Sequence, residues 1–167
     1  MLIRSVSSFK RWNGERLVHR DDALFCGDAV TDLRTSDNTL SVWLANTEED
    51  IEDAVVALTL SKDSPSKLFC LLLDEEDLAK IEIELSDTEL GKALGADEAI
   101  LKKHRNMVEL DYWRLGYLTQ YMMDLAKDAT KRRTFSDKKV VEILNKYKGN
   151  KVKPENVNIK LREKLNW

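Results

Sequence analysis

Histidine and cysteine are scarce in this chain of 167 residues, which contains two of each. Two cysteines cannot form a tetrahedral zinc site unless both histidines join them. Cys26 and Cys70 lie in apolar, strand-like segments, where a reduced thiol behaves as a small hydrophobic side chain. The sequence therefore gives little support to zinc binding, to disulfide bonding or to catalysis by a thiol.

Long apolar runs and familiar catalytic motifs are also absent. No window contains the roughly 18 consecutive apolar residues of a membrane-spanning helix, and residues 1–12 lack the apolar centre of a secretory signal. The motifs G-x-S-x-G, G-x-x-x-x-G-K-[ST] and G-x-G-x-x-G do not occur. We expect a soluble, cytoplasmic protein with no cofactor. The sequence leaves open whether it is an enzyme, and the missing motifs favour one that is not.

Charge is divided unevenly along the chain, although the net charge is only -3. Residues 1–125 hold 14 basic and 25 acidic side chains, whereas residues 126–167 hold 13 basic and 5 acidic ones. A basic tail of this kind either binds an anionic partner or folds back onto the acidic body. The sequence alone does not separate these alternatives.

The N-terminal half has the patterns of a sheet. Asn13-Gly14 predicts a two-residue hairpin turn between short strands in the first thirty residues. Residues 40–45 alternate as a half-buried strand does, and the apolar run 68–73 fits a buried central strand. Residues 81–85 alternate apolar and charged side chains, which predicts an antiparallel or edge strand.

Helical patterns follow. Thr47 caps a predicted crossover helix with Asp50 three positions later. From 97 to 127 apolar residues recur at helical spacing without a proline, which predicts one long helix with a bend near Gly116. Ser136 begins another helix, and the segment from Pro154 fits a strand or a helix, of which the proline start favours the helix.

These patterns predict an α+β fold, with a mainly antiparallel sheet from the N-terminal half, one crossover helix and a helical C-terminal half that covers the sheet. We expect a core domain over residues 1–129. Residues 130–167 are predicted to form a small basic helical extension, which packs on the core or projects from it.

The polar stretch from Asp28 to Asn38 offers the best candidates for catalysis. Asp28, Asp32 and Arg34 could line a polar site. His19 lies beside two aspartates, one of which could orient it as a general base. The alternative is a polar turn in which Asp37 and Asn38 adopt unusual backbone angles.

The acidic residues 74–77 directly follow the predicted buried strand. Asp74 and Glu76 are candidate ligands of a divalent metal, provided that Asp28 or Asp32 lies nearby. The alternative is an acidic loop that keeps the end of the strand in water.

Two features of the C-terminal half indicate binding to a macromolecule. The segment 112–123, YWRLGYLTQYMM, is apolar over more than one helix face, which predicts either a buried helix or a partner surface. The tail combines two predicted helices with basic side chains, as helix-turn-helix proteins do. Its candidate binding residues are Lys131, Arg132, Arg133, Lys153, Lys160, Arg162 and Trp167.

Three functional hypotheses follow. The first is a non-enzymatic cytoplasmic interaction or regulatory protein that binds a partner protein or a second copy of itself. The second is a nucleic-acid-binding protein that uses residues 130–167. The third is a metal-dependent hydrolase or nuclease that uses Asp28, Asp32 and residues 74–77. A membrane partner is not expected.

Overall fold

The computed structural model describes residues 1–12, 27–87, 91 and 93–167. Its strands are β1 (Leu2–Val6), β2 (Leu40–Leu44), β3 (Leu68–Leu73), β4 (Glu84–Ser86), β5 (His104–Val108) and β6 (Arg132–Phe135). They form one sheet in the order β4-β5-β2-β1-β3-β6, and each neighbouring pair is antiparallel. The predicted α+β fold with a mainly antiparallel sheet is confirmed.

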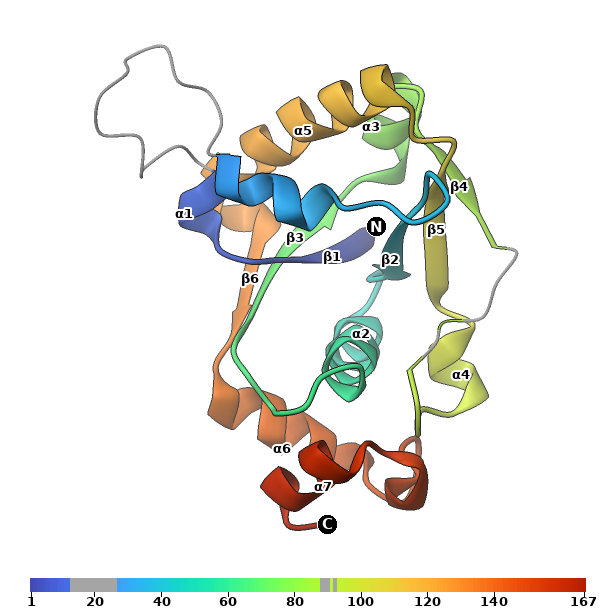
Figure 1. Cartoon of the computed structure of the whole chain (residues 1–167), viewed down its shortest axis with the longest axis vertical. Coiled ribbons are helices and arrows are strands. Elements are labelled where there is room, and N and C mark those ends of the chain that lie inside the picture. The colour runs from blue at the N-terminus through green and yellow to red at the C-terminus, as the bar shows by residue number, and fades with distance from the viewer. Residues whose placement is uncertain (13–26, 88–90, 92) are drawn as a thin grey trace.

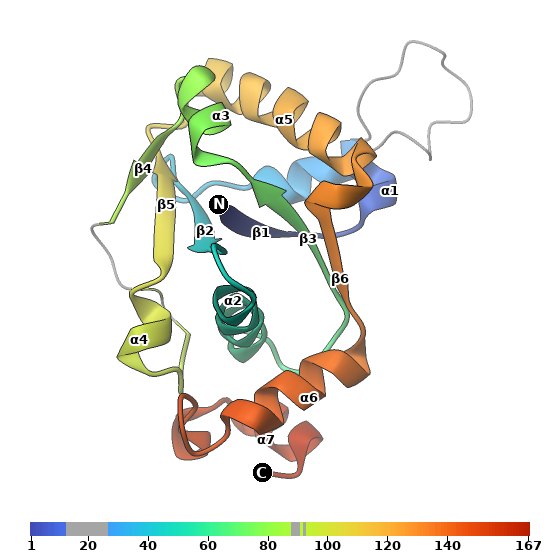
Figure 2. The same cartoon turned by 180° about the vertical axis from the view of Figure 1, so that it is seen from behind.

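Helices cover both faces of the sheet (Figures 1 and 2). The α-helices are α1 (Phe9–Trp12), α2 (Glu48–Leu60), α3 (Glu75–Lys80), α4 (Glu98–Leu101), α5 (Tyr112–Lys127), α6 (Asp137–Tyr147) and α7 (Ile159–Leu165), and the 3₁₀ helices are η1 (Gly27–Leu33), η2 (Ala129–Lys131) and η3 (Pro154–Asn156). Because side chains alternate along a strand, Leu2 packs with α1, α3 and α5, whereas Ile3 packs with α2, α4, α6 and α7. The sheet therefore separates two hydrophobic cores.

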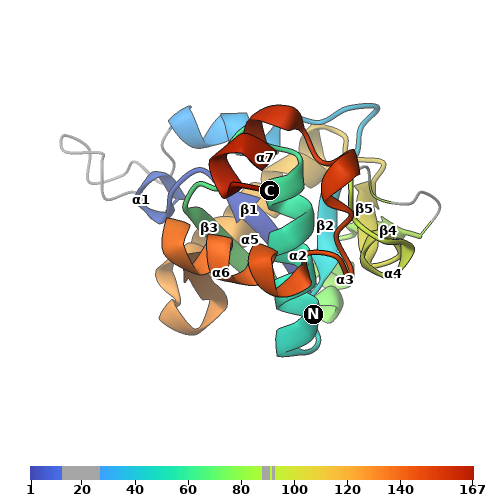
Figure 3. The same cartoon turned by 90° about the horizontal axis from the view of Figure 1, so that it is seen from below.

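Helix α2 is the predicted crossover, because it connects β2 to β3, the two strands that flank β1. The Thr47 hydroxyl accepts a hydrogen bond from the Asp50 N–H at 3.1 Å, and the Asp50 carboxylate accepts one from the Thr47 N–H at 3.0 Å. This capping box confirms the predicted helix start. Figure 3 shows α6 and α7 beside α2 on this side of the sheet.

The first thirty residues were predicted as β structure, and outside β1 this is wrong for the described part. Residues 9–12 form α1 and residues 27–33 form η1, while the predicted turn at Asn13-Gly14 lies outside the described residues. The predicted polar turn is confirmed, since Asp37 and Asn38 have φ angles of 51° and 57°. Short polar side chains tolerate this left-handed conformation, which explains the choice of residues.

The prediction of one helix over 97–127 is wrong. Residues 104–108 form β5, which pairs with β2 and β4, so pairing with the sheet overrides the helical spacing. The chain reverses at Glu109, whose φ is 53°, and the Asp111 carboxylate then caps α5 by accepting a hydrogen bond from the Arg114 N–H at 2.8 Å. His104, predicted on the helix, is a strand residue whose ring contacts that of Trp43.

Two further predictions concern residues 74–85. The acidic residues were predicted as a loop, but Asp74 caps α3 and residues 75–77 form its first turn, where negative charge favours a helix. The predicted strand 81–85 is shorter, because β4 begins at Glu84.

The C-terminal range contributes to the sheet as well as to the helical layer. The helix after Ser136 is confirmed, and the segment from Pro154 is helical, in the two pieces η3 and α7. Residues 132–135 were not predicted as a strand, yet they pair with β3. The division into domains at residues 129 and 130 stays a prediction. No helix in the described ranges is both long and apolar enough to cross a membrane.

Candidate functional site

The candidate catalytic residue Asp32 holds three structural elements together. Its Oδ2 atom accepts hydrogen bonds from the Ser7 N–H and Ser7 hydroxyl, both at 2.9 Å, and from Trp12 Nε1 at 2.7 Å. Its backbone carbonyl accepts one from the Arg4 guanidinium. Asp32 therefore ties η1 to β1 and α1. Arg34 follows η1 and is exposed.

The pKa of Arg4 is lowered to about 10 by burial, which the neighbouring Asp32 carboxylate opposes. Arg4 thus stays protonated at neutral pH. His19 and the side chain of Asp28 lie outside the described residues, so the structure does not place them against Asp32.

The candidate metal ligands Asp74 and Glu76 lie at the start of helix α3. The Asp74 carboxylate accepts a hydrogen bond from the Glu76 N–H at 2.9 Å, and the Asp74 N–H donates to the Tyr121 hydroxyl at 2.9 Å. Among the residues the structure describes, no three His, Cys, Asp or Glu side chains are grouped to hold a metal ion. Burial raises the pKa of the Cys70 thiol to about 12, which keeps this thiol protonated and unreactive.

Several of the candidate binding residues in the tail have partners within the chain. Arg132 stacks over the Phe9 ring at 5.5 Å, and Arg133 donates to the backbone carbonyls of Thr130 and Arg132. Lys160 pairs with Asp63 at 3.1 Å. Lys131 and Arg162 are half-buried, and Lys153 is exposed.

Trp167 packs on helix α6. Its indole N–H donates to the Asn145 side chain at 2.8 Å, and Lys148 lies over its ring. These contacts lie within the tail. The Lys160–Asp63 and Lys146–Glu52 pairs show that part of the basic tail folds back onto the body, which is one of the two alternatives left open by the sequence.

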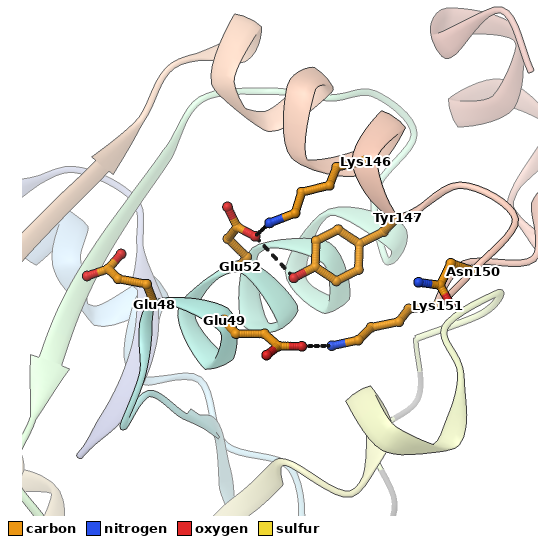
Figure 4. Close-up of a pocket in the computed structure, with 7 residues that line it drawn as sticks. All are labelled: Glu48, Glu49, Glu52, Lys146, Tyr147, Asn150 and Lys151. Atoms are coloured by element: carbon orange, nitrogen blue, oxygen red, sulfur yellow. Dashed lines mark hydrogen bonds and ion pairs between the residues drawn. The ribbon is translucent and has the colours of Figure 1, made fainter.

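A charged pocket of about 400 Å³ lies where α2 meets the end of α6 and the loop after it (Figure 4). Its lining residues are Glu48, Glu49, Glu52, Lys146, Tyr147, Asn150 and Lys151. The Glu52 carboxylate accepts hydrogen bonds from Lys146 and from the Tyr147 hydroxyl. Burial raises the pKa of Glu52, but these hydrogen bonds and the charges of nearby lysines together lower it by more, so the net shift is downward.

Asp53 lies beside this pocket with only 1% of its side chain exposed. It accepts hydrogen bonds from Lys103 at 2.5 Å and from Lys151 at 3.0 and 3.1 Å. Lys103 also pairs with Asp50 at 2.6 Å, and Lys151 with Glu49 at 2.6 Å. Carboxylates of α2 thus pair with lysines from distant segments. We call the following residues the ion-pair cluster: Glu49, Asp50, Glu52, Asp53, Lys103, Lys146 and Lys151.

The opposite side of the sheet carries a different surface, on the outer side of α5 (Figure 1). Tyr112, Trp113 and Tyr117 are 85%, 73% and 54% exposed. The rings of Tyr112 and Trp113 meet edge to face at 6.2 Å. Gly116 lies between them and Tyr117 in the sequence, and a Cβ atom built on it would have no heavy atom within 4 Å. We call these four residues the aromatic face.

The sequence predicted that this helix is either buried or a partner surface. One side of α5 is buried and another is exposed, and the partner surface stays a prediction. Leu118, Met122 and Met123 are buried in the core beneath α5. Tyr121 is half-buried, and the pKa of its hydroxyl is raised by burial and by the carboxylates of Asp77 and Asp74. The aromatic face lies on the solvent side. Periodicity alone did not show which aromatic side chains would be exposed.

An acidic groove of about 560 Å³ adjoins α5, where α3 and β4 lie close to it (Figures 1 and 2). Its lining residues are Glu75, Ala79, Glu82, Ile83, Glu84, Leu85 and Arg114. Arg114 donates to the Glu109 carbonyl at 2.9 Å, and its guanidinium is 3.6 Å from the Glu109 carboxylate. The only cation that lines the groove therefore already has an acidic partner.

No protein-family model, curated protein or solved structure matches this chain. The aromatic face and the acidic groove were not among the candidate site residues chosen from the sequence. The available signal was Asp111, which caps α5 and thereby marks where the helix begins.

Proposed function

We propose that this protein is a non-enzymatic interaction protein that binds another protein through the aromatic face of α5. The observation that carries this proposal is the exposure of Tyr112, Trp113 and Tyr117 on one helix. Large aromatic side chains lose stabilisation when they stay in water, and tryptophan and tyrosine dominate the binding energy of protein interfaces. The ion-pair cluster is a weaker candidate, because its charges are already matched within the chain.

Gly116 supports the same surface. A glycine inside a helix costs about 1 kcal/mol relative to alanine. The described part of the chain gives no packing reason for this glycine, since apart from the adjacent residues and the helix's own backbone it places no heavy atom within 4 Å of where the Cβ would be. A partner whose backbone or ring approaches α5 closely would supply one, because a side chain at this position would hold it off.

The proposal includes a cytoplasmic location and a regulatory role through binding. Cys70 is a buried free thiol, which is usual in a reducing compartment. Binding partners rather than substrates are favoured because Asp32, the best catalytic candidate, uses its carboxylate for three structural hydrogen bonds.

The test compares affinity capture by the unaltered chain and by the double variant Trp113→Ala/Tyr117→Ala, from nuclease-treated extract of the source cells. We expect quantitative mass spectrometry to find a protein that only the unaltered chain retains. The purified partner should then bind with a dissociation constant at least about 30-fold weaker for the variant, as two interface aromatics imply. Equal retention by both chains would contradict the proposal.

Nucleic-acid binding through the tail is the second candidate, favoured by the exposed Lys138, Lys139 and Lys153. The tail lysines Lys146 and Lys151 are already paired with carboxylates of α2, which weakens the case for nucleic-acid binding. Anisotropy of labelled duplex DNA and single-stranded RNA at two salt concentrations tests it. Binding that weakens steeply with salt would favour nucleic-acid binding over protein binding as the function.

A further inference from the structure

We infer that the partner of the aromatic face presents a basic segment, rich in arginine or lysine, which also occupies the acidic groove beside α5. This inference rests on the proposed function, because it names the chemistry of the ligand for the same surface. Three observations carry it, namely the charge of the groove, the composition of its lining and the aromatic side chains next to it.

The first observation is unmatched negative charge. Residues 74–84 contain six carboxylates and one lysine, Lys80, which pairs with Asp77 at 2.6 Å. Within the described part of the chain, the carboxylates of Glu76, Glu82 and Glu84 have no hydrogen bond or ion pair. Like charges held together repel one another, and a cationic ligand relieves that repulsion. The charge of this surface therefore selects a basic partner and disfavours a nucleic acid.

The second observation is the mixed lining of the groove. Ile83 is buried at its floor, Leu85 is half-buried, and Glu82 and Glu84 are exposed beside them. Arginine and lysine have an apolar stem and a charged head, so they can lay the stem along apolar side chains while the head reaches carboxylates. The groove offers both kinds of contact.

The third observation is that aromatic rings adjoin this charge. Arg114 lines the groove, and Tyr117, three residues later, is its neighbour on the helix surface. Exposed tryptophan and tyrosine rings attract cations, most often the guanidinium group of arginine. A basic segment that crosses from the groove to Tyr117 and Trp113 would gain ion pairs at one end and ring stacking at the other.

A second copy of the chain is a weaker occupant, because its basic tail is partly neutralised. Lys146, Lys151 and Lys160 each have a carboxylate partner within the same chain. Two such copies would also meet through different surfaces, which builds open-ended assemblies rather than a closed dimer.

The experiment selects random peptides of about 12 residues, displayed on phage, against the immobilised full chain. A parallel selection uses the double variant Trp113→Ala/Tyr117→Ala. We expect the full chain to enrich peptides with an excess of arginine and lysine over acidic residues, and the variant to lose them. One enriched peptide is then labelled and titrated by anisotropy.

Charge variants of the full chain test the groove directly with that peptide. Glu82→Gln/Glu84→Gln should raise its dissociation constant about tenfold at low salt and less at high salt, because the contacts are exposed ion pairs. The matched control is Glu142→Gln/Glu155→Gln, which removes two exposed carboxylates from the tail and should leave binding unchanged.

Each other outcome has a distinct meaning. Enriched peptides without basic excess that still require Trp113 and Tyr117 would overturn the basic partner and leave the proposed function standing. Peptides enriched equally by the variant would overturn both. If the full chain enriches no peptide at all, the linear basic segment is overturned, and the capture experiment then decides the proposed function. Concentration-dependent sedimentation that Trp113→Ala abolishes would make a second copy the occupant and overturn the inference.

Discussion

The ion-pair cluster on α2 and the acidic groove beside α5 are both rich in carboxylates, but they differ in what surrounds them. On α2, Asp53 and its neighbours meet lysines that come from distant parts of the same chain. Beside α5, Glu82 and Glu84 are exposed to water, and α5 itself carries exposed aromatic rings. Charge that is matched internally stabilises the fold, whereas unmatched charge next to apolar surface is available to a partner.

The largest expected effect is at the centre of the ion-pair cluster. Asp53→Ala leaves Lys103 and Lys151 without their buried carboxylate, so we expect the free energy of unfolding to fall by about 3 kcal/mol. Urea denaturation measures this. The control Glu98→Ala breaks an exposed pair with Lys102 and should change stability much less than Asp53→Ala does. Equal losses of stability in Asp53→Ala and Glu98→Ala would contradict the idea that the ion-pair cluster stabilises the fold more than an exposed pair does.

Strong acid should destabilise the fold through the carboxylates of α2. The pKa values of Glu52 and Asp50 are lowered, since burial raises them but hydrogen bonds from lysine and other neighbours lower them by more. A lowered pKa in the folded state stabilises the protein above the ordinary values of 4.5 and 3.8, and this stabilisation is lost as the pH falls below them.

The variant that tests this is Glu52→Gln. We expect it to lower the free energy of unfolding by about 1 kcal/mol at pH 7 and to lose less stability than the unaltered chain as the pH falls. Urea unfolding from pH 7 to pH 3 provides the measurement. Glu84→Gln, an exposed carboxylate of the acidic groove, is the control and should change the stability at pH 7 by less than about 0.5 kcal/mol. A larger loss of stability for Glu84→Gln than for Glu52→Gln would reverse the comparison.

Gly116→Ala tests whether this glycine of α5 serves binding rather than stability. The added methyl group contacts nothing in the chain and improves helix propensity, so the protein should become more stable by about 0.5–1 kcal/mol. Binding of the captured partner, measured by calorimetry, should weaken. A gain in stability without any loss of binding would remove Gly116 from the interface.

The smallest expected effect on stability is at the aromatic face itself. Trp113→Ala and Tyr117→Ala remove mostly exposed rings, so each should change the free energy of unfolding by less than about 0.5 kcal/mol. Leu118→Ala, one residue from Tyr117 but fully buried, should cost about 2–4 kcal/mol. Thermal and urea unfolding of the three variants tests whether the surface serves the fold or a partner.

Local signals in the sequence were enough to predict much of the fold. Thr47 with Asp50, Ser136 and Pro154 each begin a helical segment through contacts within a few residues. The strands 40–44 and 68–73 were predicted because alternation and continuous apolarity reflect their burial. The fold class follows from these elements together.

The sequence misled where long-range pairing decides the structure. Residues 104–108 satisfy a helical spacing, but their partners in β2 lie about sixty positions earlier and no local pattern contains that information. The candidate site was harder to predict, because exposure depends on which side of α5 meets the sheet. Asp32 was chosen for its polar surroundings, yet those surroundings reflect a structural junction with Ser7 and Trp12.

The position of Asp53 also has a consequence for synthesis on the ribosome. Its lysine partners follow it by 50 and 98 residues, so translation delivers the carboxylate long before both cations. A nascent chain that has not yet emerged beyond Lys151 would have to bury an incompletely neutralised charge. We expect α2 to remain loosely docked, and open to chaperones and proteases, until the last part of the chain emerges.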